Sequence, residues 1–477
     1  MSFYILTIPL KTEQFQEHIL NKQFEKYRKI YNACIKELYK RYNHMVQSKE
    51  YQKNCKSDRI DRNKVFYELD KRFGLTEYSL HYFTKPMAKY FNVNAMITQV
   101  IHKRAFKSFR LLMLHKAKKI KYKSYGELNS IEGKTSKKSI IFRDDNILFA
   151  GLKIPVVIKK NDYYSRIALT DKIKYCRIER KIIKGKYHYY VQFIIEGVPP
   201  MKINKEIGEI KHYINDGIVG LDIGTQSLAI CSKTEVKLLE LAPEIQNIEK
   251  QKRVMQRKLD RSRRSTNPNK FNDNGTYKIK NNIRWIKSNR YIKIQMELKE
   301  LYRKQREIRK QSHNTLANYI LTLGNDIKVE NMDFVKLQNR NSTISKNTGE
   351  IVKNKKFGKS LENKAPSMLL TILDTKLKWL NTQLKKVNTY TVKASQYNHV
   401  KNNYIKKNLN ERWNNFGEFK IQRDLYSAFL IMNVNDDLCS INRDSCFEKF
   451  NEFKVLHDIE IDRLKNLQNN QIIKSLI

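Results

Sequence analysis

Three carboxylates are set apart by the apolar residues around them. Asp222 lies in the run "GIVGLDIGTQSLAIC", Glu330 ends the stretch "IKVE", and Asp424 precedes the apolar pattern "LYSAFLIM". A carboxylate at the edge of a core costs free energy unless a ligand or a hydrogen bond replaces the lost water. Hydrolysis of a phosphodiester by two metal ions needs carboxylates that converge from separate elements, and Mg²⁺ prefers such oxygen ligands. The three residues are therefore candidates for a site of this kind.

Each candidate also has an ordinary explanation. Asp424 fits a helix N-cap, and Glu330 fits a solvent-facing strand residue. Asp222, followed by a Gly-Thr pair, is equally typical of the phosphate-binding hairpin of actin-like and sugar-kinase-like ATPases. Such an ATPase needs further glycine loops, because backbone amides approach a phosphate closely only where side chains are absent. The glycines after Gly224 are all isolated, which favours the nuclease: Gly275, Gly324, Gly349, Gly358 and Gly417.

The charge of the chain points to a polyanionic partner. The 477 residues include 94 Lys and Arg against 48 Asp and Glu, a formal net charge of +46. Such a chain repels itself unless it binds a polyanion, and nucleic acid is the commonest one. A ribosome-like or merely soluble basic protein is the plainer alternative, and a membrane-surface protein is less favoured. The length predicts about two to four domains.

Cysteine usage and hydropathy indicate an intracellular protein. The six cysteines contain no C-x-x-C pair, which argues against a disulfide framework and a cysteine zinc site. No run of about 18 apolar residues occurs, and the start "MSFYILTIPLKTEQF" lacks the pattern of a secretory signal. We expect reduced, mostly buried thiols and no membrane partner.

The first half of the chain changes its hydrophobic period twice. Residues 3–9 predict a short strand, and residues 13–123 predict basic amphipathic helices. Residues 139–197 alternate with period two and include a hairpin that turns at 184–186. Four aromatic residues of this hairpin fit either base stacking or a core. They are Tyr187, Tyr189, Tyr190 and Phe193.

The second half alternates strands with helices around the three carboxylates. After the strand with Asp222, two charged helices are predicted, joined by a polar loop at 265–282. A strand at 326–334 carries Glu330, and the polar residues 339–364 predict a mobile loop. A helix over 366–386, a strand over 389–393 and a helix over 423–432 that is entered at Asp424 follow. The tail after about 435 is polar, with one weakly indicated helix around Leu456, Ile459 and Leu464.

Several of these segments resemble the TnpB-type RNA-guided nucleases of insertion sequences, relatives of the type V CRISPR effectors. The likeness covers most of residues 1–432 and includes "YCRIERKIIKGKYHYYVQFIIEG", "VGLDIGTQSLAICS", "MQRKLDRSRR", "IKVENMDF" and "QRDLYSAFLI". The resemblance implies that Asp222, Glu330 and Asp424 are the catalytic triad and the Mg²⁺ ligands of a split RuvC nuclease. It also implies that a guide RNA supplies sequence specificity while the protein reads a short flanking DNA motif.

The resemblance implies an α+β multidomain fold. A small β-barrel (the wedge) is interrupted by a helical recognition lobe and followed by a split RNase-H-like (RuvC) α/β nuclease domain. The expected boundaries are 1–15 and 126–205 for the barrel, 16–125 for the recognition lobe, 216–393 and 421–435 for the nuclease with a helical bridge insert at about 245–320, 394–420 for a degenerate zinc-ribbon-like lobe that binds target nucleic acid, and 436–477 for a polar tail.

The chain departs from the family pattern in two places. The family usually has a four-cysteine zinc ribbon, but the matching positions here are Asn398, Lys401, Trp413 and Phe416, which form no zinc ligand set. His399 alone cannot hold a metal. We therefore expect no zinc, and a lobe that is either held by Trp413, Phe416 and Phe419 or poorly ordered. The second departure is that Tyr426 and Leu430 replace two asparagines after Asp424, which puts the catalytic rate in doubt.

The leading hypothesis is an RNA-guided DNA endonuclease that uses two Mg²⁺ ions, with Mn²⁺ as a substitute, and leaves 5′-phosphate ends. One basic stretch is expected to contact the guide–target backbone without reading bases. It comprises Arg257, Lys258, Arg261, Arg263 and Arg264 and contains one acidic residue, too few for ion pairing along a solvated helix face. The partners would be double-stranded target DNA and a guide RNA, either a transposon-end omega-type RNA or a crRNA.

Rival hypotheses keep the nucleic acid and change the activity. An RNA-guided repressor would occupy DNA without cutting it, and a type V effector would take its guide from a CRISPR array. A transposase acting without RNA would carry no defined RNA. In each case we expect the protein in the cytoplasm of a prokaryote, associated with the nucleoid when it is bound to DNA.

Overall fold

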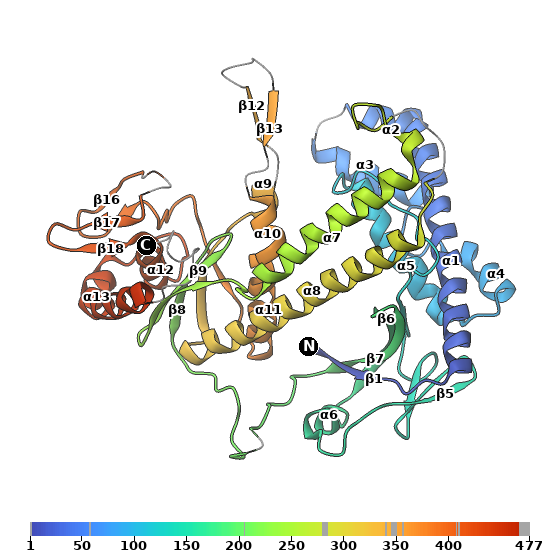
Figure 1. Cartoon of the computed structure of the whole chain (residues 1–477), viewed down its shortest axis with the longest axis horizontal. Helices are drawn as coiled ribbons and strands as arrows, with labels where there is room; N and C mark the ends of the chain where they lie inside the picture. Colours follow the sequence, from blue (N-terminus) through green and yellow to red (C-terminus); the bar gives the residue numbers. More distant parts are fainter. Residues whose placement is uncertain are drawn as a thin grey trace. The chain divides into compact units, whose positions relative to one another are not determined.

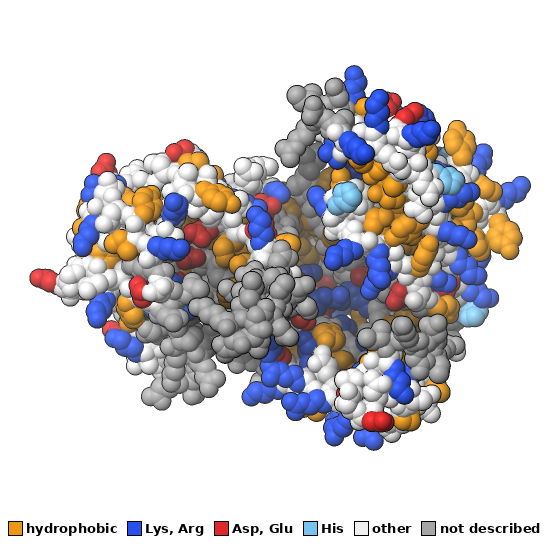
Figure 2. All heavy atoms as spheres, turned by 90° about the horizontal axis from the view of Figure 1, so that it is seen from above, with side chains coloured by type: hydrophobic (Ala, Val, Ile, Leu, Met, Phe, Trp, Pro, Cys, Tyr) orange, Lys and Arg blue, Asp and Glu red, His pale blue; other side chains and the backbone are white. Residues whose placement is uncertain are grey.

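A computed structural model describes residues 2–56, 59–204, 206–278, 285–338, 341–344, 351–354, 357–406, 408 and 411–466. The chain forms two compact units, Met1–Pro200 and Met201–Ile477. Helices and several sheets occur in the chain, so the fold is mixed α+β (Figure 1). Lys and Arg side chains spread widely over the face drawn in Figure 2, with Asp and Glu scattered among them. No helix within the described residues is long and apolar enough to cross a membrane.

The helices of the first unit pack through the apolar stripe that the sequence predicts. The longest of them, α1, buries Leu20, Phe24, Tyr27 and other residues at three- to four-residue spacing, and it packs against α5. The helices are α1 Gln14–Gln47, α2 Lys49–Asn54, α3 Arg59–Arg72, α4 His81–Tyr90, α5 Ala95–Met113 and α6 Tyr163–Ala168.

The strands of the first unit form open sheets. One sheet has the order β1-β7-β6-β2, with every pair antiparallel, and a second has the order β3-β4-β5. A bridge between Leu10 and Val156 joins the two sheets. The expected small barrel is therefore not closed among the described residues. The strands are β1 Phe3–Pro9, β2 Ser130–Glu132, β3 Ile141–Arg143, β4 Asn146–Phe149, β5 Leu152–Pro155, β6 Ile173–Ile183 and β7 Lys186–Glu196.

One mixed sheet organises the second unit. Its order is β10-β9-β8-β11-β14, with the first three strands antiparallel and β8, β11 and β14 parallel. The parallel pairs are connected through helices, as parallel strands require. The strands are β8 Ile218–Ile223, β9 Ser227–Cys231, β10 Val236–Glu240, β11 Asp326–Glu330 and β14 Lys385–Val387. The strand expected at 389–393 thus lies a few residues earlier.

Helices cover both faces of this sheet. On one face, α8 and α11 pack against alternate residues of β8 and β11, including Val219, Leu221 and Ile327. On the other face, α12 and α13 form a second core with Cys231 and Leu238 of β9 and β10. The helices are α7 Ile245–Thr266, η1 Pro268–Lys270, α8 Asn289–Leu323, α9 Phe334–Gln338, α10 Gly358–Lys364, α11 Pro366–Trp379, α12 Arg423–Met432 and α13 Arg443–Asn466.

Two segments expected as irregular contain ordered structure, and the tail contains the helix that its pattern weakly indicated. The loop 265–282 is built, as far as residue 278, from the end of α7, η1 and a bridge between Phe271 and Tyr277. The loop 339–364 contains α10 and a hairpin of β12 Asn341–Ile344 with β13 Ile351–Asn354. The tail contains α13, which buries Phe453 and Leu464 but exposes Ile459. Residues 467–477 lie outside the described part.

Short strand pairs complete the lobe between β14 and α12. They are β15 Tyr397–Asn398 with β16 Asn403–Tyr404 and β17 Trp413–Asn415 with β18 Lys420–Gln422. Trp413, Phe416 and Phe419 pack against the core formed by α12 and α13. Of the two expectations for this lobe, the structure therefore supports apolar packing.

Candidate active site

Two of the three carboxylates lie on neighbouring parallel strands. The register pairs Lys328 of β11 with Gly220 of β8, and Val329 with Leu221. Continuing this register places Glu330 beside Asp222. Because side chains alternate along a strand, Asp222 shares a face with Gly220, and Glu330 shares it with Lys328. This is the face that α12 covers.

The third carboxylate arrives on α12, whose position depends on Gly220. A Cβ added at Gly220 would lie 2.1 Å from the carbonyl oxygen of Ala428 and 2.5 Å from the amide nitrogen of Met432. The helix backbone therefore rests directly on the strand at this glycine. The four residues from Asp424 to Ala428 rise about 6 Å along the helix. The two from Gly220 to Asp222 advance about 6.6 Å along the strand. Antiparallel packing thus brings Asp424 to Asp222.

The pKa of Asp222 reflects its burial and the charges of the other two carboxylates. Burial, then the charges of Glu330 and Asp424, raise the pKa of Asp222 well above its ordinary value, against smaller opposing effects of Arg423 and of a hydrogen bond with Ser427. Burial also raises the pKa of Glu330. Mutual repulsion in a half-buried setting is unfavourable for the isolated protein. Such an arrangement is typical of functional sites, where a bound ligand compensates for it.

Asp424 sits in the first turn of α12 and does not cap it. The side chain of Gln422 accepts the hydrogen bond from the backbone N–H of Leu425 and is the N-cap. Asp424 instead accepts hydrogen bonds of 3.2 Å from Nε and Nη2 of Arg423. Arg412 lies 4.0 Å from its other oxygen. The N-cap explanation of Asp424 is therefore wrong.

Lys328 is a residue of this region that the sequence did not single out. It is 3% exposed, and its ammonium donates a hydrogen bond to the carbonyl of Val434, just beyond the end of α12. Burial lowers its pKa. A cation at the carbonyl end of a helix is favourable, as are carboxylates at its amide end. The alternation "IKVE" was the available signal, since it places Lys328 on the same face as Glu330.

The oxygen atoms of the three carboxylates suit a hard divalent cation, but the side chains do not form a complete metal-binding site. Among the described residues, no group of three or more His, Cys, Asp or Glu side chains is placed to hold a metal ion. Three carboxylates, of which Glu330 and Asp424 raise the pKa of Asp222, nevertheless supply the oxygen ligands and negative charge that Mg²⁺ prefers. Asp424 forms an ion pair of 3.2 Å with Arg423.

Aromatic rings occupy the lobe where the family resemblance places zinc ligands. Phe416 stacks on Phe419 with centroids 5.5 Å apart, and His399 lies 4.6 Å from Phe450 of α13. Asn398 accepts hydrogen bonds from two backbone amides, including that of Lys401, and so forms a turn. We call the rings of His399, Phe416, Phe419, Tyr426, Phe429, Phe447, Phe450 and Phe453 the aromatic cluster.

Tyr426 and Leu430, which replace the two asparagines of the family pattern, are part of the core around the aromatic cluster. The hydroxyl of Tyr426 lies 2.6 Å from Nδ1 of His399 and accepts the backbone N–H of the same residue at 3.1 Å. Burial lowers the pKa of His399 to about 4, so its ring is neutral and can accept the phenol proton. Leu430 is fully buried in the same core. Both replacements therefore connect α12 to the core and are not polar groups in the site.

The five residues predicted to contact nucleic acid all lie on α7, but they differ in whether an acidic residue already pairs with them. Asp260 forms ion pairs with Arg263 at 2.6 Å and with Arg264 at 2.8 Å. Those two guanidinium groups also lie over Trp285 and Phe271, respectively. Within the described residues, Arg257, Lys258 and Arg261 form no ion pair, so their charges are available to phosphates.

Comparisons with known proteins give solved structures of low identity, and two of them are chains of CRISPR effector complexes. The chain is similar to one in the cryo-EM structure of the Cas12f1–sgRNA–target DNA complex, with a TM-score of 0.47 and 14% identity, over 88% of this chain and 83% of that one. It is also similar to one in a CRISPR–Cas12f ternary complex, with a TM-score of 0.29 and 13% identity, over 90% and 83%. The sequence matches no family model and no curated protein.

Proposed function

We propose that the chain is an RNA-guided DNA endonuclease that cuts target DNA beside a short flanking motif. The second unit would be its RNase-H-like (RuvC) domain, with Asp222, Glu330 and Asp424 as catalytic metal ligands. The observation that carries this proposal is the approach of these carboxylates from β8, β11 and α12 in a chain of net charge +46. Polyanion binding and phosphodiester hydrolysis account for both features.

The residues of the site have distinct tasks in this reaction. Mg²⁺ bound here, or Mn²⁺ in its place, would supply an activated water and stabilise the leaving 3′ oxygen. Asp222 and Glu330 hold negative charge on adjacent strands, so their repulsion favours cation binding. Arg423 orients Asp424 through its two hydrogen bonds. Gly220 positions α12 by allowing close backbone contact between the strand and the helix. Lys328 positions it by a hydrogen bond at the carbonyl end of the helix.

Phosphate binding is assigned to α7 on the basis of the three cations that form no ion pair with any residue that the structure describes. Arg257, Lys258 and Arg261 would contact the backbone of the guide–target duplex, which carries no sequence information. Arg263 and Arg264 would contribute less, because Asp260 neutralises part of their charge. Base pairing with the guide would then determine which DNA is cut.

The test is cleavage of a matched DNA target by the protein purified with the RNA of its native locus. We expect Mg²⁺-dependent cutting that Asp222→Ala abolishes while guided binding persists. Asp326→Ala is the matched control, because Asp326 lies on β11 but pairs with Lys385 at the far end of the strand. Guided binding without cleavage in Mg²⁺ or Mn²⁺ would refute the nuclease.

Sequencing the RNA that co-purifies separates the remaining sources of guidance. A transposon-end RNA would identify an omega-type guide, and a repeat-derived RNA would identify a crRNA. Absence of any defined RNA would contradict guidance and support a transposase that acts alone.

A guided repressor is the second candidate, and one observation favours it. The described carboxylates do not form a complete metal-binding site, and Asp424 forms an ion pair with Arg423. If this arrangement persisted in the complex, the protein would occupy DNA without cutting it. The cleavage assay above distinguishes the two functions.

A further inference from the structure

The start of α12 is hydrogen-bonded to the C-terminal helix α13. Gln422, the N-cap of α12, ends β18 and is fully buried, and its side chain accepts the backbone N–H of Leu425 at 2.8 Å. The backbone N–H of Gln422 donates to Nε2 of His457 at 3.0 Å. His457 lies on α13 and is 1% exposed. A contact between residues 35 apart in the sequence therefore fixes the start of the helix that carries Asp424.

His457 supplies a hydrogen-bond acceptor that α12 itself lacks. In a capping box, the N-cap side chain accepts the N–H of the third helical residue, and the side chain of that residue accepts the N–H of the N-cap. The first of these bonds is present in α12, but its third residue is Leu425, whose side chain has no acceptor. The imidazole of His457 takes that place. Because a buried N–H without an acceptor is unfavourable, this contact stabilises the observed start of α12.

The surroundings of His457 fix its protonation state and its orientation. Nε2 accepts a backbone N–H, so the ring proton is on Nδ1, which lies 2.8 Å from a carboxylate oxygen of Asp458. Burial lowers the pKa of His457, against opposing effects of Asp458 and Glu460. The rings of Trp413 and Phe453 lie against it, with centroids 6.3 Å and 6.0 Å away. The imidazole is therefore neutral and held in one tautomer.

Gln422 also contacts the carboxylate of Asp424. Its side-chain amide donates a long hydrogen bond of 3.5 Å to Oδ2 of Asp424, while Arg423 donates to Oδ1 at 3.2 Å. The carboxylate is thus oriented by the two residues that precede it. Because His457 holds the backbone of Gln422, a change at His457 should alter the direction in which Asp424 points. Residues that orient a metal ligand commonly affect metal affinity or activity about 10- to 100-fold.

We propose that His457 is a positioning residue for Asp424, so that α13 is required for metal binding at the candidate active site. The inference rests on the proposed function for the identity of the ligand, which is a divalent cation. α13 lies in the tail, beyond the residues that carry the family resemblance. The tail would therefore be part of the nuclease.

Mn²⁺ binding to the full chain freed of nucleic acid tests the proposal without relying on cleavage. Electron paramagnetic resonance measures the free Mn²⁺ during a titration, and the site is the binding that Asp222→Ala removes. His457→Leu removes the acceptor at similar volume and should weaken this binding about 10- to 100-fold. His457→Gln places an amide oxygen near the position of Nε2 and should restore most of it. We expect the same order for the Mg²⁺ concentration that half-saturates cleavage of a guided target.

Two substitutions on α13 separate positioning from stability. Leu464 is 2% exposed and packs in the core shared with α12. Leu464→Ala should lower the melting temperature but leave Mn²⁺ binding unchanged while the protein is folded. The side chain of Asp458 is 60% exposed, so Asp458→Ala should fold. This variant loses the acceptor for Nδ1–H and should weaken Mn²⁺ binding, but less than His457→Leu does.

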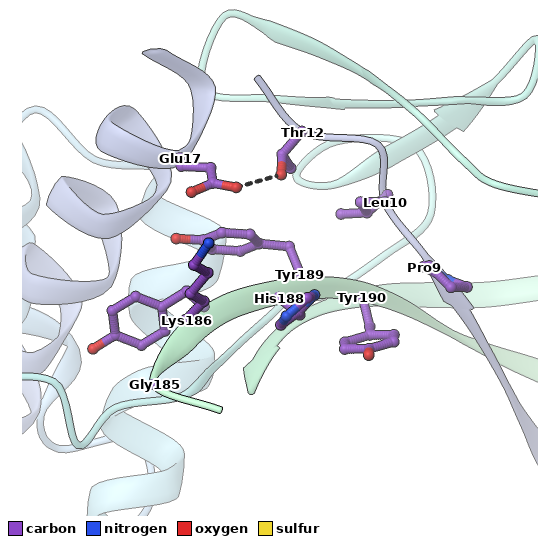
Figure 3. A pocket seen from close by; sticks show the side chains of 10 residues that line it. Pro9, Leu10, Thr12, Glu17, Gly185, Lys186, His188, Tyr189 and Tyr190 are labelled. Atoms are coloured by element: carbon purple, nitrogen blue, oxygen red, sulfur yellow. Dashed lines mark hydrogen bonds between the residues drawn. The ribbon is translucent and has the colours of Figure 1, made fainter. Parts of the chain in front are cut away.

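A substitution in the first unit controls for the loss of a hydrogen bond at the start of a helix. Thr12 precedes α1, and its hydroxyl donates a hydrogen bond of 2.8 Å to Glu17 in the first turn (Figure 3). Thr12→Val keeps the shape of the side chain and removes this bond. Because Thr12 lies in the other unit, Mn²⁺ binding should remain that of the wild type.

The outcomes distinguish this proposal from the proposed function. The role of His457 is overturned if folded His457→Leu binds Mn²⁺ like the wild type, or if His457→Gln binds it no better than His457→Leu. If His457→Leu does not fold, unchanged Mn²⁺ binding in Asp458→Ala overturns it.

The two proposals also fail separately. An Asp222-dependent Mn²⁺ site that weakens in His457→Leu, in a protein that cuts no guided target, refutes the nuclease alone. Guided cleavage whose Mg²⁺ requirement is the same in His457→Leu refutes the role of His457 alone. Absence of both the Mn²⁺ site and cleavage refutes both proposals.

Discussion

Substituting Gly220 with alanine should disturb the candidate active site more than the rest of the fold. The new Cβ would lie 2.1 Å from the carbonyl oxygen of Ala428, whereas ordinary contacts begin at 3.4 Å. The blocking atom belongs to the helix backbone, which has no alternative rotamer. Either α12 must therefore move by about 1.3 Å or the strand must shift. Overpacking of this kind costs about 1–3 kcal/mol, and two backbone atoms in contact favour the upper end.

The displacement falls on Asp424, which is one turn from the contact. A misplacement of about 1 Å in a catalytic group can cost about 10²-fold in rate. We therefore expect Gly220→Ala to lower the melting temperature by about 6–12 °C and the cleavage rate by about 10²-fold. Calorimetry and a single-turnover cleavage assay measure the two effects.

Leu373→Ala provides the matched control. Leu373 of α11 is fully buried on the opposite face of the sheet, so its truncation should cost about 2–5 kcal/mol without moving α12. At a temperature where both variants are folded, only Gly220→Ala should be slow. The reasoning is refuted if Gly220→Ala melts like the wild type, or if both variants lose activity equally.

Three further predictions concern the same unit. Without divalent cations, Asp222→Asn should raise the melting temperature while abolishing cleavage, because it removes a charge opposed by burial, Glu330 and Asp424; a lower melting temperature would contradict this. The pKa of His399 is lowered from 6.5 to about 4, so the unfolded chain binds a proton that the folded one does not, and stability should fall between pH 6.5 and 4 by up to about 3 kcal/mol. Denaturant titrations of the wild type and of His399→Gln test this, and equal pH dependence would count against it. A zinc chelator should leave the melting temperature unchanged, whereas Phe450→Ala should lower stability by about 3–5 kcal/mol through loss of the aromatic cluster; a chelator effect would show a metal.

The sequence was sufficient to find the three carboxylates, because each is visible against apolar neighbours. It also predicted the strands that carry Asp222 and Glu330 and the helix that carries Asp424. Their convergence could not be read from local pattern, since it depends on Gly220 and on the antiparallel packing of α12 on β8. A glycine within an apolar strand carries no sign of the helix that will rest on it.

Tertiary contacts also decided how far ordered structure extends in polar segments, including the weakly indicated helix of the tail. Residues 436–466 have few apolar positions, yet α13 is fixed by Phe453 and by Glu460, whose buried carboxylate accepts the backbone N–H of Leu238. Likewise, Tyr189 and Phe193 proved to be buried while Tyr187 and Tyr190 stay partly exposed, a division that strand alternation alone did not assign.

The aromatic cluster determines how the stability of its lobe responds to conditions. A lobe held by a metal owes its stability to the free concentration of that ion. Burial of rings instead contributes a large heat capacity of unfolding, so the stabilisation curves with temperature and weakens in the cold. The lobe around Phe416 and Phe450 should therefore weaken on cooling, and its opening would loosen α12 through the contact between His399 and Tyr426.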